Sequence, residues 1–374
     1  MTKQLTVKYN DVPIYDIILE KDFSNFLSVF DTIRKEQGIE NRNQPMFLNK
    51  KVCIVSDSEV SSHYIKDIIK SLRDHVKEIK TFTFTAGESS KNLDTVYNLY
   101  DMLIENNFDR KDILIALGGG VVGDLTGYTA ATYLRGVSFI QVPTSLLAMV
   151  DSSIGGKTGV DFHAYKNMIG AFHQPKAVYI NLSTLNSLTD RQFNSGLGEI
   201  IKHGLIKDYD YYQWIDANKE AIKSKDLSVL MEMIDRSCAI KRDVVEKDPK
   251  ELGERALLNF GHTLGHAIEK LMEFKLLHGE CVTLGMVAAG FISYQRGGIT
   301  KEQLIDMERL FDYFNMPIRI NGLLADEILQ VASHDKKMES GKLKFILLSR
   351  IGNAVIDTTV TRDELIGAIQ YILN

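Results

Sequence analysis

The first half of the chain alternates short apolar runs with stretches of helical periodicity, and this alternation limits the possible folds more than any other feature. The clearest run is residues 112–117, where Asp is followed by Ile-Leu-Ile-Ala-Leu. Uninterrupted apolar runs of this length are typical of strands buried on both faces of a parallel sheet. Other strands are expected at 52–55, 81–84, 138–142 and 177–180, an N-terminal hairpin at 5–19, and helices at 22–35, 60–72 and up to about 104. The pattern predicts a doubly wound, Rossmann-like parallel sheet, which binds ligands at the carboxyl ends of its strands.

The pattern changes near residue 180, after which long amphipathic helices predominate. The predicted fold class is therefore α/β + α, with an α/β domain at 1–180 and a mostly helical domain at 181–374. Helices are expected at 190–206, 227–248, 261–274, 279–295 and 301–314, followed by a hairpin of 344–348 with 354–356 and a last helix.

Composition excludes several classes of protein. A chain of 374 residues exceeds one ordinary core, and its net charge of −5 argues against a nucleic-acid surface. No apolar run approaches the roughly 20 residues of a membrane helix. Cys53, Cys238 and Cys281 are few and scattered, which indicates thiols in a reducing compartment and predicts a cytoplasmic protein.

A glycine-rich segment directly follows the run at 112–117. Gly118, Gly120 and Gly123 occupy the glycine positions of G-x-G-x-x-G, which lets backbone N–H groups approach a pyrophosphate at a helix N-terminus. The acidic residue that usually follows about 20 positions later is missing. The alternative is a tight strand–helix turn that needs positive φ. Asp57, Glu88 and Lys91 supply polar groups suited to ribose and adenine, which favours a dinucleotide such as NAD.

Three histidines indicate a metal site. His262 and His266 are one helical turn apart and share a face, and His278 follows after a short turn. Glu199, on another predicted helix, is the candidate carboxylate. Zn2+ and similar ions bind such groups and leave one position open for substrate. The alternative is that these histidines are partly exposed side chains or hydrogen-bonded core residues.

Cationic side chains recur around these motifs. Lys157 lies in a second Gly-rich loop, expected at residues 151–158, and Lys166 follows this loop. Lys202 is three residues from Glu199 on the same predicted helix face. Many cations beside a metal indicate an anionic substrate with phosphate and carboxylate groups. The residues alone therefore predict an NAD- and metal-dependent enzyme that acts on a small phosphorylated hydroxy compound.

The same motifs resemble the 3-dehydroquinate synthase family. The resemblance extends from about residue 57 to 337, whereas the first fifty residues contribute little. The segments that carry it are Gly118-Gly-Gly-Val-Val-Gly-Asp-Leu-Thr-Gly127, Val142-Pro-Thr-Ser-Leu-Leu-Ala-Met-Val-Asp151-Ser-Ser-Ile-Gly-Gly-Lys157-Thr, Lys166-Asn167, Gly198-Glu199-Ile-Ile-Lys202, Asn259-Phe-Gly-His262-Thr-Leu-Gly-His266-Ala-Ile-Glu and His278-Gly-Glu280.

The resemblance implies a lyase reaction of the shikimate pathway, which supplies aromatic amino acids. The substrate would be 3-deoxy-D-arabino-heptulosonate 7-phosphate (DAHP), and the products 3-dehydroquinate and phosphate. The sequence of steps would be transient oxidation by NAD, β-elimination of phosphate, re-reduction, and intramolecular aldol closure. NAD would be regenerated in each cycle.

The resemblance also implies roles for individual residues. Glu199, His262 and His278 would bind the metal, Zn2+ or Co2+. Arg135 would reach the phosphate in a neighbouring subunit, which implies a homodimer. The residues implied to hold or process the substrate are Lys157, Asn167, Lys202, Lys241, Arg255, Asn259, His266 and Lys336, with Lys337 as the alternative to the last. Those implied to contact NAD are Asp57, Glu88, Lys91, Gly119, Gly120, Val121, Asp124, Thr144, Ser145, Asp151, Lys157, Lys166 and Thr184.

Three alternatives stay open at this point. Other sugar-phosphate cyclases, such as 2-deoxy-scyllo-inosose or epi-valiolone synthase, share the fold and cofactors but differ in substrate-pocket residues. A glycerol or iron-type alcohol dehydrogenase would release NADH and would not need so many cations. A catalytically silent binding subunit would have lost metal ligands, and none is lost here.

Overall fold

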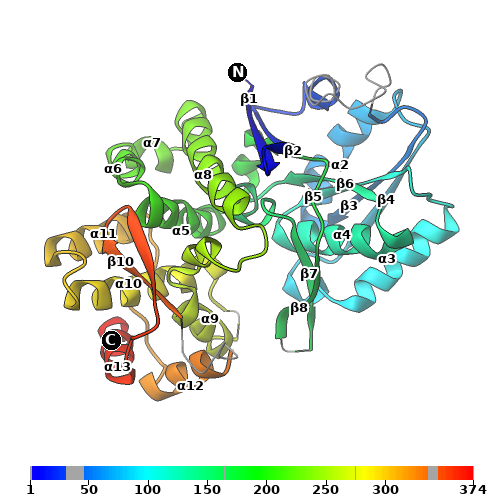
Figure 1. Cartoon of the computed structure of the whole chain (residues 1–374). Coiled ribbons are helices and arrows are strands. Elements are labelled where there is room, and N and C mark those ends of the chain that lie inside the picture. Colours follow the sequence, from blue (N-terminus) through cyan, green and yellow to red (C-terminus); the bar gives the residue numbers. More distant parts are fainter. Residues whose placement is uncertain (1, 31–45, 164, 274, 336–343, 374) are drawn as a thin grey trace. The chain divides into compact units, whose positions relative to one another are not determined.

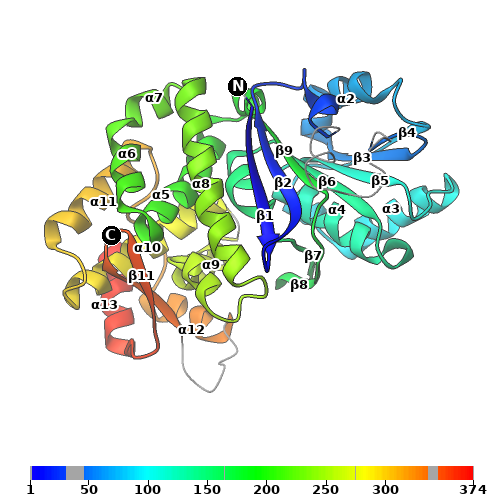
Figure 2. The same ribbon diagram turned by 45° about the horizontal axis from the view of Figure 1, so that its top comes forward.

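The computed structural model describes residues 2–30, 46–163, 165–273, 275–335 and 344–373. The chain forms two compact units, Met1–Ser187 and Leu188–Asn374 (Figure 1, Figure 2). The roles that the sequence assigned to 1–180 and 181–374 stay predictions. The end of the helix expected at 22–35, and both Lys336 and Lys337, lie outside the described residues.

The first unit is built on a seven-stranded sheet of order β1-β2-β9-β6-β5-β3-β4. Its neighbouring strands pair in parallel, apart from the antiparallel hairpin of β1 with β2. This confirms the predicted Rossmann-like sheet and N-terminal hairpin. The strands are β1 (Lys3–Tyr9), β2 (Val12–Glu20), β3 (Lys51–Asp57), β4 (Glu78–Phe84), β5 (Ile113–Gly118), β6 (Ser138–Pro143) and β9 (Ala177–Asn181).

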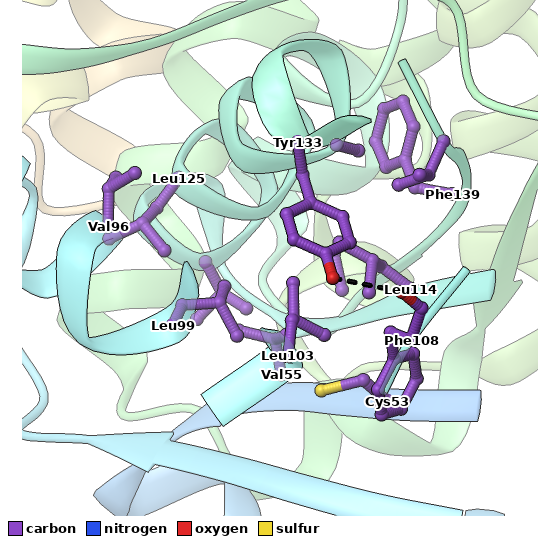
Figure 3. Close-up of a cluster of buried hydrophobic side chains, with 14 of the residues drawn as sticks. Cys53, Val55, Val96, Leu99, Leu103, Phe108, Leu114, Leu125, Tyr133 and Phe139 are labelled. Carbon is purple, nitrogen blue, oxygen red and sulfur yellow. Dashed lines mark hydrogen bonds between the residues drawn. The ribbon is translucent and has the colours of Figure 1, made fainter. Parts of the chain in front are cut away.

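Helices cover both faces of this sheet because alternate residues of each strand point to opposite sides. Ile54 of β3 packs in one apolar cluster with Ile68 of α2 (Ser58–Leu72). Its neighbour Val55 packs in a second cluster with residues of α3 (Leu93–Glu105) and α4 (Gly120–Thr132), shown in Figure 3. In that cluster the Tyr133 hydroxyl donates a buried hydrogen bond of 2.9 Å to the carbonyl of Phe108. Both faces of the sheet are thus apolar, as the uninterrupted strand pattern predicted.

One expectation for this unit is wrong. The second Gly-rich segment is not a loop throughout, because residues 157–172 form an antiparallel hairpin of β7 (Lys157–Phe162) and β8 (Tyr165–Phe172). Lys157 therefore begins a strand, and Lys166 lies within one. Gly159 and Gly170 allow the two strands to approach closely, since a Cβ on either would overlap or crowd the opposing backbone. The segment before the hairpin is the π-helix η3 (Ala148–Ser152).

The second unit is mostly helical, which confirms the predicted change of pattern. Each of the five helices expected between 190 and 314 is present within two or three residues of its predicted bounds. The elements are α5 (Asp190–Lys207), α6 (Tyr209–Ala217), α7 (Lys219–Lys223), α8 (Leu227–Lys247), η5 (Glu254–Asn259), α9 (His262–Leu271), α10 (His278–Gln295), α11 (Lys301–Tyr313), α12 (Ala325–Asp335), β10 (Phe345–Arg350), β11 (Asn353–Asp357) and α13 (Arg362–Ile372).

Helix α10 is the centre of this unit. It packs against α5, α9, α11, α13 and β10, and most of its residues are buried. A helix surrounded in this way is apolar on all sides rather than on one face. Its buried position places its first residue, His278, beside α5 and α9. In the described parts of the chain, no helix combines the length and apolar character that crossing a membrane requires.

Candidate active site

The turn from β5 into α4 contains the first glycine motif. Strand β5 ends at Gly118, and α4 begins at Gly120. The alternative of a left-handed turn is wrong, because no glycine between 118 and 123 has positive φ. Glycine is needed here for close packing: a Cβ on Gly118 would overlap Val122, and one on Gly123 would lie 2.6 Å from Oε1 of Gln141. Among the described residues no side chain caps α4, which leaves its first backbone N–H groups for an anion.

Polar groups converge beside this turn. The Nζ of Lys91 donates to Oδ2 of Asp124 at 2.6 Å and to Oδ1 of Asn167 at 2.5 Å. Lys166 lies 3.5 Å from Glu88. Burial disfavours a charged Lys91, but the carboxylates of Asp124 and Glu88 outweigh burial and hold the Lys91 pKa above its usual value. The structure therefore gathers four predicted NAD contacts, and it places Asn167, a predicted substrate contact, with them.

Other predicted NAD residues flank the same turn. The backbone N–H of Thr144 donates to the carbonyl of Gly118 at 3.0 Å. A Cβ on Gly119 would lie 3.5 Å from Oγ of Ser145. Asp151 belongs to the π-helix η3, an element that is frequent at functional sites. These residues surround the N-terminus of α4, where an anion would bind.

Asp57 and Thr184, two further residues predicted to contact NAD, make local hydrogen bonds within the first unit. Oδ1 of Asp57 accepts the N–H groups of Glu59 and Val60 and so caps α2. Thr184 donates its hydroxyl to the carbonyl of Asn181. These bonds give Asp57 and Thr184 local structural roles in addition to the predicted contacts with NAD.

Arg135 lies in a strained turn. It has φ of 67° and follows Leu134, which has φ of 49°. A left-handed Leu is a conformational outlier, and such strain is concentrated at functional positions. Both side chains are exposed, Leu134 by 40% of its surface.

Three predicted metal ligands converge in the second unit. Glu199 lies in the middle of α5, His262 begins α9 and His278 begins α10. Oε1 of Glu199 is 3.7 Å from Nε2 of His262 and 3.9 Å from Nε2 of His278. Ligand atoms at about 2.0–2.1 Å from a tetrahedral metal lie roughly 3.3 Å apart, so the three atoms are close to the spacing of a metal shell.

The carboxylate of Glu199 shows how well this arrangement fits a cation. Glu199 is fully buried, and its Oε2 is paired with the ammonium group of Lys202. Its Oε1 has no hydrogen-bond partner in the described residues. A buried carboxylate oxygen without a partner is costly, and a metal ion between it and the two imidazole nitrogens removes that cost.

The surroundings of Nδ1 in His262 and His278 also fit a role of these histidines as metal ligands. Nδ1 of His262 lies 3.2 Å from the carbonyl of Phe260, and Nδ1 of His278 lies 3.6 Å from Oε2 of Glu269. Acceptors in these positions favour a proton on Nδ1, which would leave the Nε2 lone pair for a metal. Burial, reinforced by Lys202 and the two other histidines, lowers the pKa of His262 well below its usual value, which keeps the ring neutral. Sequence reasoning missed Glu269, although it is within the Asn259-to-Glu269 motif.

His266 is the third histidine of the cluster. Its ring centroid is 5.2 Å from that of His262 and 5.7 Å from that of His278. One nitrogen of each histidine lies within 4.8 Å of one nitrogen of each of the other two, so His266 is a possible further ligand. It is more exposed than His262 and His278, which places it at the open side of the centre.

Predicted substrate residues lie close by in the same unit. Lys202, Lys241 and Arg255 are nearly fully buried, and α5, α8 and η5, which carry them, pack together. Nη1 of Arg255 donates to the carbonyl of Pro249 at 2.9 Å, and Nδ2 of Asn259 donates to Oε1 of Glu251 at 2.8 Å.

Asp248 orders the loop that precedes Arg255, and sequence reasoning missed it. Its carboxylate accepts backbone N–H groups from Leu252, Gly253 and Arg255 at 2.7–3.0 Å. Although burial opposes the charge, these three bonds lower the pKa of Asp248. The sequence signal was its position at the end of α8, where an acidic residue can accept from a following turn.

The fold, an N-terminal parallel sheet followed by a mostly helical part, defines a class of enzymes that solved structures share. They include 2-epi-5-epi-valiolone synthase from Streptomyces hygroscopicus, which is 25% identical with a TM-score of 0.87 over 98% of this chain and 99% of that one. A 2-deoxy-scyllo-inosose synthase shows a TM-score of 0.85 at 24% identity over 99% of both chains. An iron-containing alcohol dehydrogenase shows 0.67 at 14% identity over 98% of both chains.

Sequence comparison identifies the family within this class. The family profiles for the N-terminal and C-terminal parts of 3-dehydroquinate synthase match residues 81–195 and 196–338. The 3-dehydroquinate synthase of Acetivibrio thermocellus is 46% identical over 322 residues, which are 86% of this chain and 89% of that protein. That of Ruminiclostridium cellulolyticum is 44% identical over 320 residues, 85% and 89% of the two chains. The chain belongs to the 3-dehydroquinate synthase family and is a lyase, which confirms the resemblance.

Proposed function

We propose that this chain converts DAHP to 3-dehydroquinate and phosphate with the help of NAD and a divalent metal, Zn2+ or Co2+. Family membership supports the reaction. One observation supports the metal most directly, namely the partnerless Oε1 of Glu199 facing Nε2 of His262 and of His278. The reaction has no net redox change, so NAD is regenerated rather than consumed.

When bound, the metal supplies a Lewis acid that polarises a substrate oxygen, and NAD supplies a reversible hydride acceptor. Glu199, His262 and His278 would hold the metal. Lys202 pairs with Oε2 of Glu199, which leaves Oε1 as the ligand atom. Glu269, 3.6 Å from Nδ1 of His278, would favour a proton on that nitrogen and leave Nε2 for the metal.

NAD would bind in the first unit at the uncapped N-terminus of α4. The solved 2-epi-5-epi-valiolone synthase carries NAD and Zn2+, and the 2-deoxy-scyllo-inosose synthase carries NAD and Co2+. In this chain, the amides at Gly119 and Gly120 would bind the pyrophosphate. The polar group of Lys91, Asp124 and Glu88 would hold the adenosine side. The other proposed contacts are Asp57, Val121, Thr144, Ser145, Asp151, Lys157, Lys166 and Thr184.

The substrate anion would be held by buried cations. The family acts on a phosphorylated sugar substrate, and a related synthase was solved with carbaglucose-6-phosphate. Lys202 pairs with the metal ligand Glu199, and Lys241 and Arg255 are buried on α8 and η5, which pack against the helix of Glu199. Burial excludes the water that would screen their charge. Asn259 and His266 add hydrogen-bonding groups. Lys157, Asn167 and Lys336 complete the proposed set.

The proposed assembly is a homodimer in the cytoplasm. Arg135 would extend to the phosphate of a neighbouring subunit, and the strained, exposed turn that presents it supports this. The hairpin β7–β8 exposes Tyr165, Met168 and Phe172, an apolar surface that a second copy could cover. Free, buried cysteines fit a reducing compartment. Sedimentation equilibrium tests the assembly, and a mass of one chain would contradict it.

The metal ligands are tested by the zinc content of purified variants. Glu199→Gln and His278→Ala are expected to contain far less than one equivalent of zinc after dialysis, whereas the wild type retains about one. His63, an exposed histidine of α2, provides the matched control, and His63→Ala is expected to retain wild-type zinc. Wild-type zinc content in His278→Ala would refute the ligand set.

A further inference from the structure

An ion pair joins the first turns of the two helices that carry Glu199 and His278. Nε of Arg191, in α5, donates to Oε1 of Glu280 at 2.7 Å, and Nη2 donates to Oε2 at 2.7 Å. Nη2 also donates to the carbonyl of Lys275 at 2.9 Å. A bidentate guanidinium–carboxylate pair restricts both distance and orientation, unlike a single contact between point charges.

Glu280 also organises the start of α10. Its Oε2 accepts the backbone N–H of Leu277 at 2.7 Å, which is one half of a capping box. His278 is the residue between this capped position and Gly279. One carboxylate therefore fixes the backbone around His278 and attaches that backbone to α5.

Close packing leaves α5 and α10 little freedom at this point. The backbone N–H of Gly279 donates to Oγ of Ser195 at 3.0 Å, and a Cβ on Gly279 would overlap the carbonyl of Ser195. One turn further along α5, a Cβ on Gly198 would lie 3.1 Å from the carbonyl of Gly279. The contact between the helices thus lies directly between the ion pair and Glu199.

We propose that Arg191 and Glu280 are positioning residues for the metal centre. Their ion pair holds the first turn of α10 against α5 and thereby sets the distance between Oε1 of Glu199 and Nε2 of His278, which is 3.9 Å. The inference rests on the proposed function, because it takes these two side chains as metal ligands. The carboxylate of Glu280 is engaged by Arg191 and by the backbone N–H of Leu277, so the pair acts through the ligands rather than on the metal.

The test compares metal affinity in two arginine variants of the full-length protein. Arg191 is half exposed, so Arg191→Gln is expected to fold. Its dissociation constant for Zn2+, measured by competition with a fluorescent chelator on metal-free protein, is expected to rise about tenfold or more. Arg191→Lys keeps the charge without the bidentate geometry, and an intermediate affinity is expected.

Arg296 provides the matched control at the opposite end of α10. It makes the same kind of bidentate pair, with Glu364, at 2.6 and 2.8 Å. Arg296→Gln is expected to lower thermal stability without changing Zn2+ affinity. Wild-type affinity in Arg191→Gln, or equal weakening in Arg296→Gln, would overturn the positioning role.

His278→Ala in the same assay separates this inference from the proposed ligand set. Loss of Zn2+ binding in His278→Ala together with wild-type affinity in Arg191→Gln would refute the positioning role alone. Wild-type affinity in His278→Ala would refute the ligand set on which it rests.

Discussion

The two oxygens of Glu199 have different surroundings, and this difference is the main residue-scale feature of the site. Oε2 is paired with Lys202, whereas Oε1 faces two imidazole nitrogens without a hydrogen bond. The pair is fully buried, so each charge depends on the other when no metal is bound. Lys202 therefore stabilises the metal-free state in addition to its proposed contact with substrate.

Removing Lys202 is expected to destabilise the metal-free protein strongly. Lys202→Met leaves a buried carboxylate without its cation, which costs about 3 kcal/mol or more of unfolding free energy. Zn2+ is expected to restore part of this stability because it binds only the folded ligand set. Urea unfolding of chelator-treated protein, with and without added Zn2+, measures both effects.

The double variant Glu199→Leu/Lys202→Met is the control. It removes both charges and is expected to recover most of the lost stability while no longer responding to Zn2+. A double variant as unstable as Lys202→Met would show that the buried ion pair does not control stability here.

At the scale of elements, α9 and α10 approach each other through glycine. A Cβ on Gly285 of α10 would overlap the carbonyl of Gly261, which lies just before His262. Gly261 itself has φ of 80°, so it occupies a backbone conformation that favours glycine. The position of His262 thus depends on the absence of side chains at two positions.

Two Gly→Ala substitutions within helices are expected to have opposite effects. Gly285→Ala forces α9 and α10 apart and is expected to cost about 2 kcal/mol or more of unfolding free energy. Gly367→Ala, in α13, meets no atom within 4 Å and is expected to stabilise the protein by about 0.5 kcal/mol through helix propensity. Thermal or urea unfolding measures both, and destabilisation of equal size in the two variants would contradict the packing argument.

The attachment of α13 to α10 is expected to depend on pH. Hydrogen bonds from Arg296, followed by those from Thr361, lower the pKa of Glu364 from 4.5 to about 2. Because the folded pKa lies below the unfolded value, this carboxylate contributes stability above about pH 4.5 that is lost as pH falls toward 2. Comparing urea unfolding of wild type and Arg296→Gln across this range tests the contribution.

The difference in unfolding free energy between wild type and Arg296→Gln is expected to be present near neutral pH. It is expected to disappear as pH falls toward 2. A difference that persists at the lowest pH would show that Arg296 acts through packing rather than through the charge of Glu364.

The sequence predicted the elements whose pattern is local and missed those that depend on distant contacts. The strand β5 and the helix α10 have long apolar runs, and the helices α5, α8, α9 and α11 have apolar residues at helical spacing, so these elements were found. The hairpin β7–β8 was missed because neither strand has a clear alternation of apolar and polar residues in its sequence. The short helices α6, α7 and α12 were also missed. The pair of Arg191 with Glu280 spans 89 residues, which no local pattern reveals.

At the scale of the whole molecule, the proposed cofactor sites belong to different units. The glycine turn and the polar group of Lys91 lie in Met1–Ser187, whereas the metal ligands lie in Leu188–Asn374. Residue types and spacing indicated both sites because each has a dense local motif. Glu269, which lies beside His278, and Asp248, which orders the loop before Arg255, were missed because their roles depend on folded geometry. Activity is expected to need the complete chain together with both cofactors.

The most direct test of the central claim is phosphate release from DAHP by the purified full-length protein, with NADH absorbance followed in the same sample. Phosphate release is expected to require both NAD and Zn2+ or Co2+, to stop when the metal is chelated, and to proceed without accumulation of NADH. This combination would demonstrate an internal redox cycle. Absence of phosphate release, with NADH accumulating from another polyol, would contradict the account and assign the chain a dehydrogenase activity.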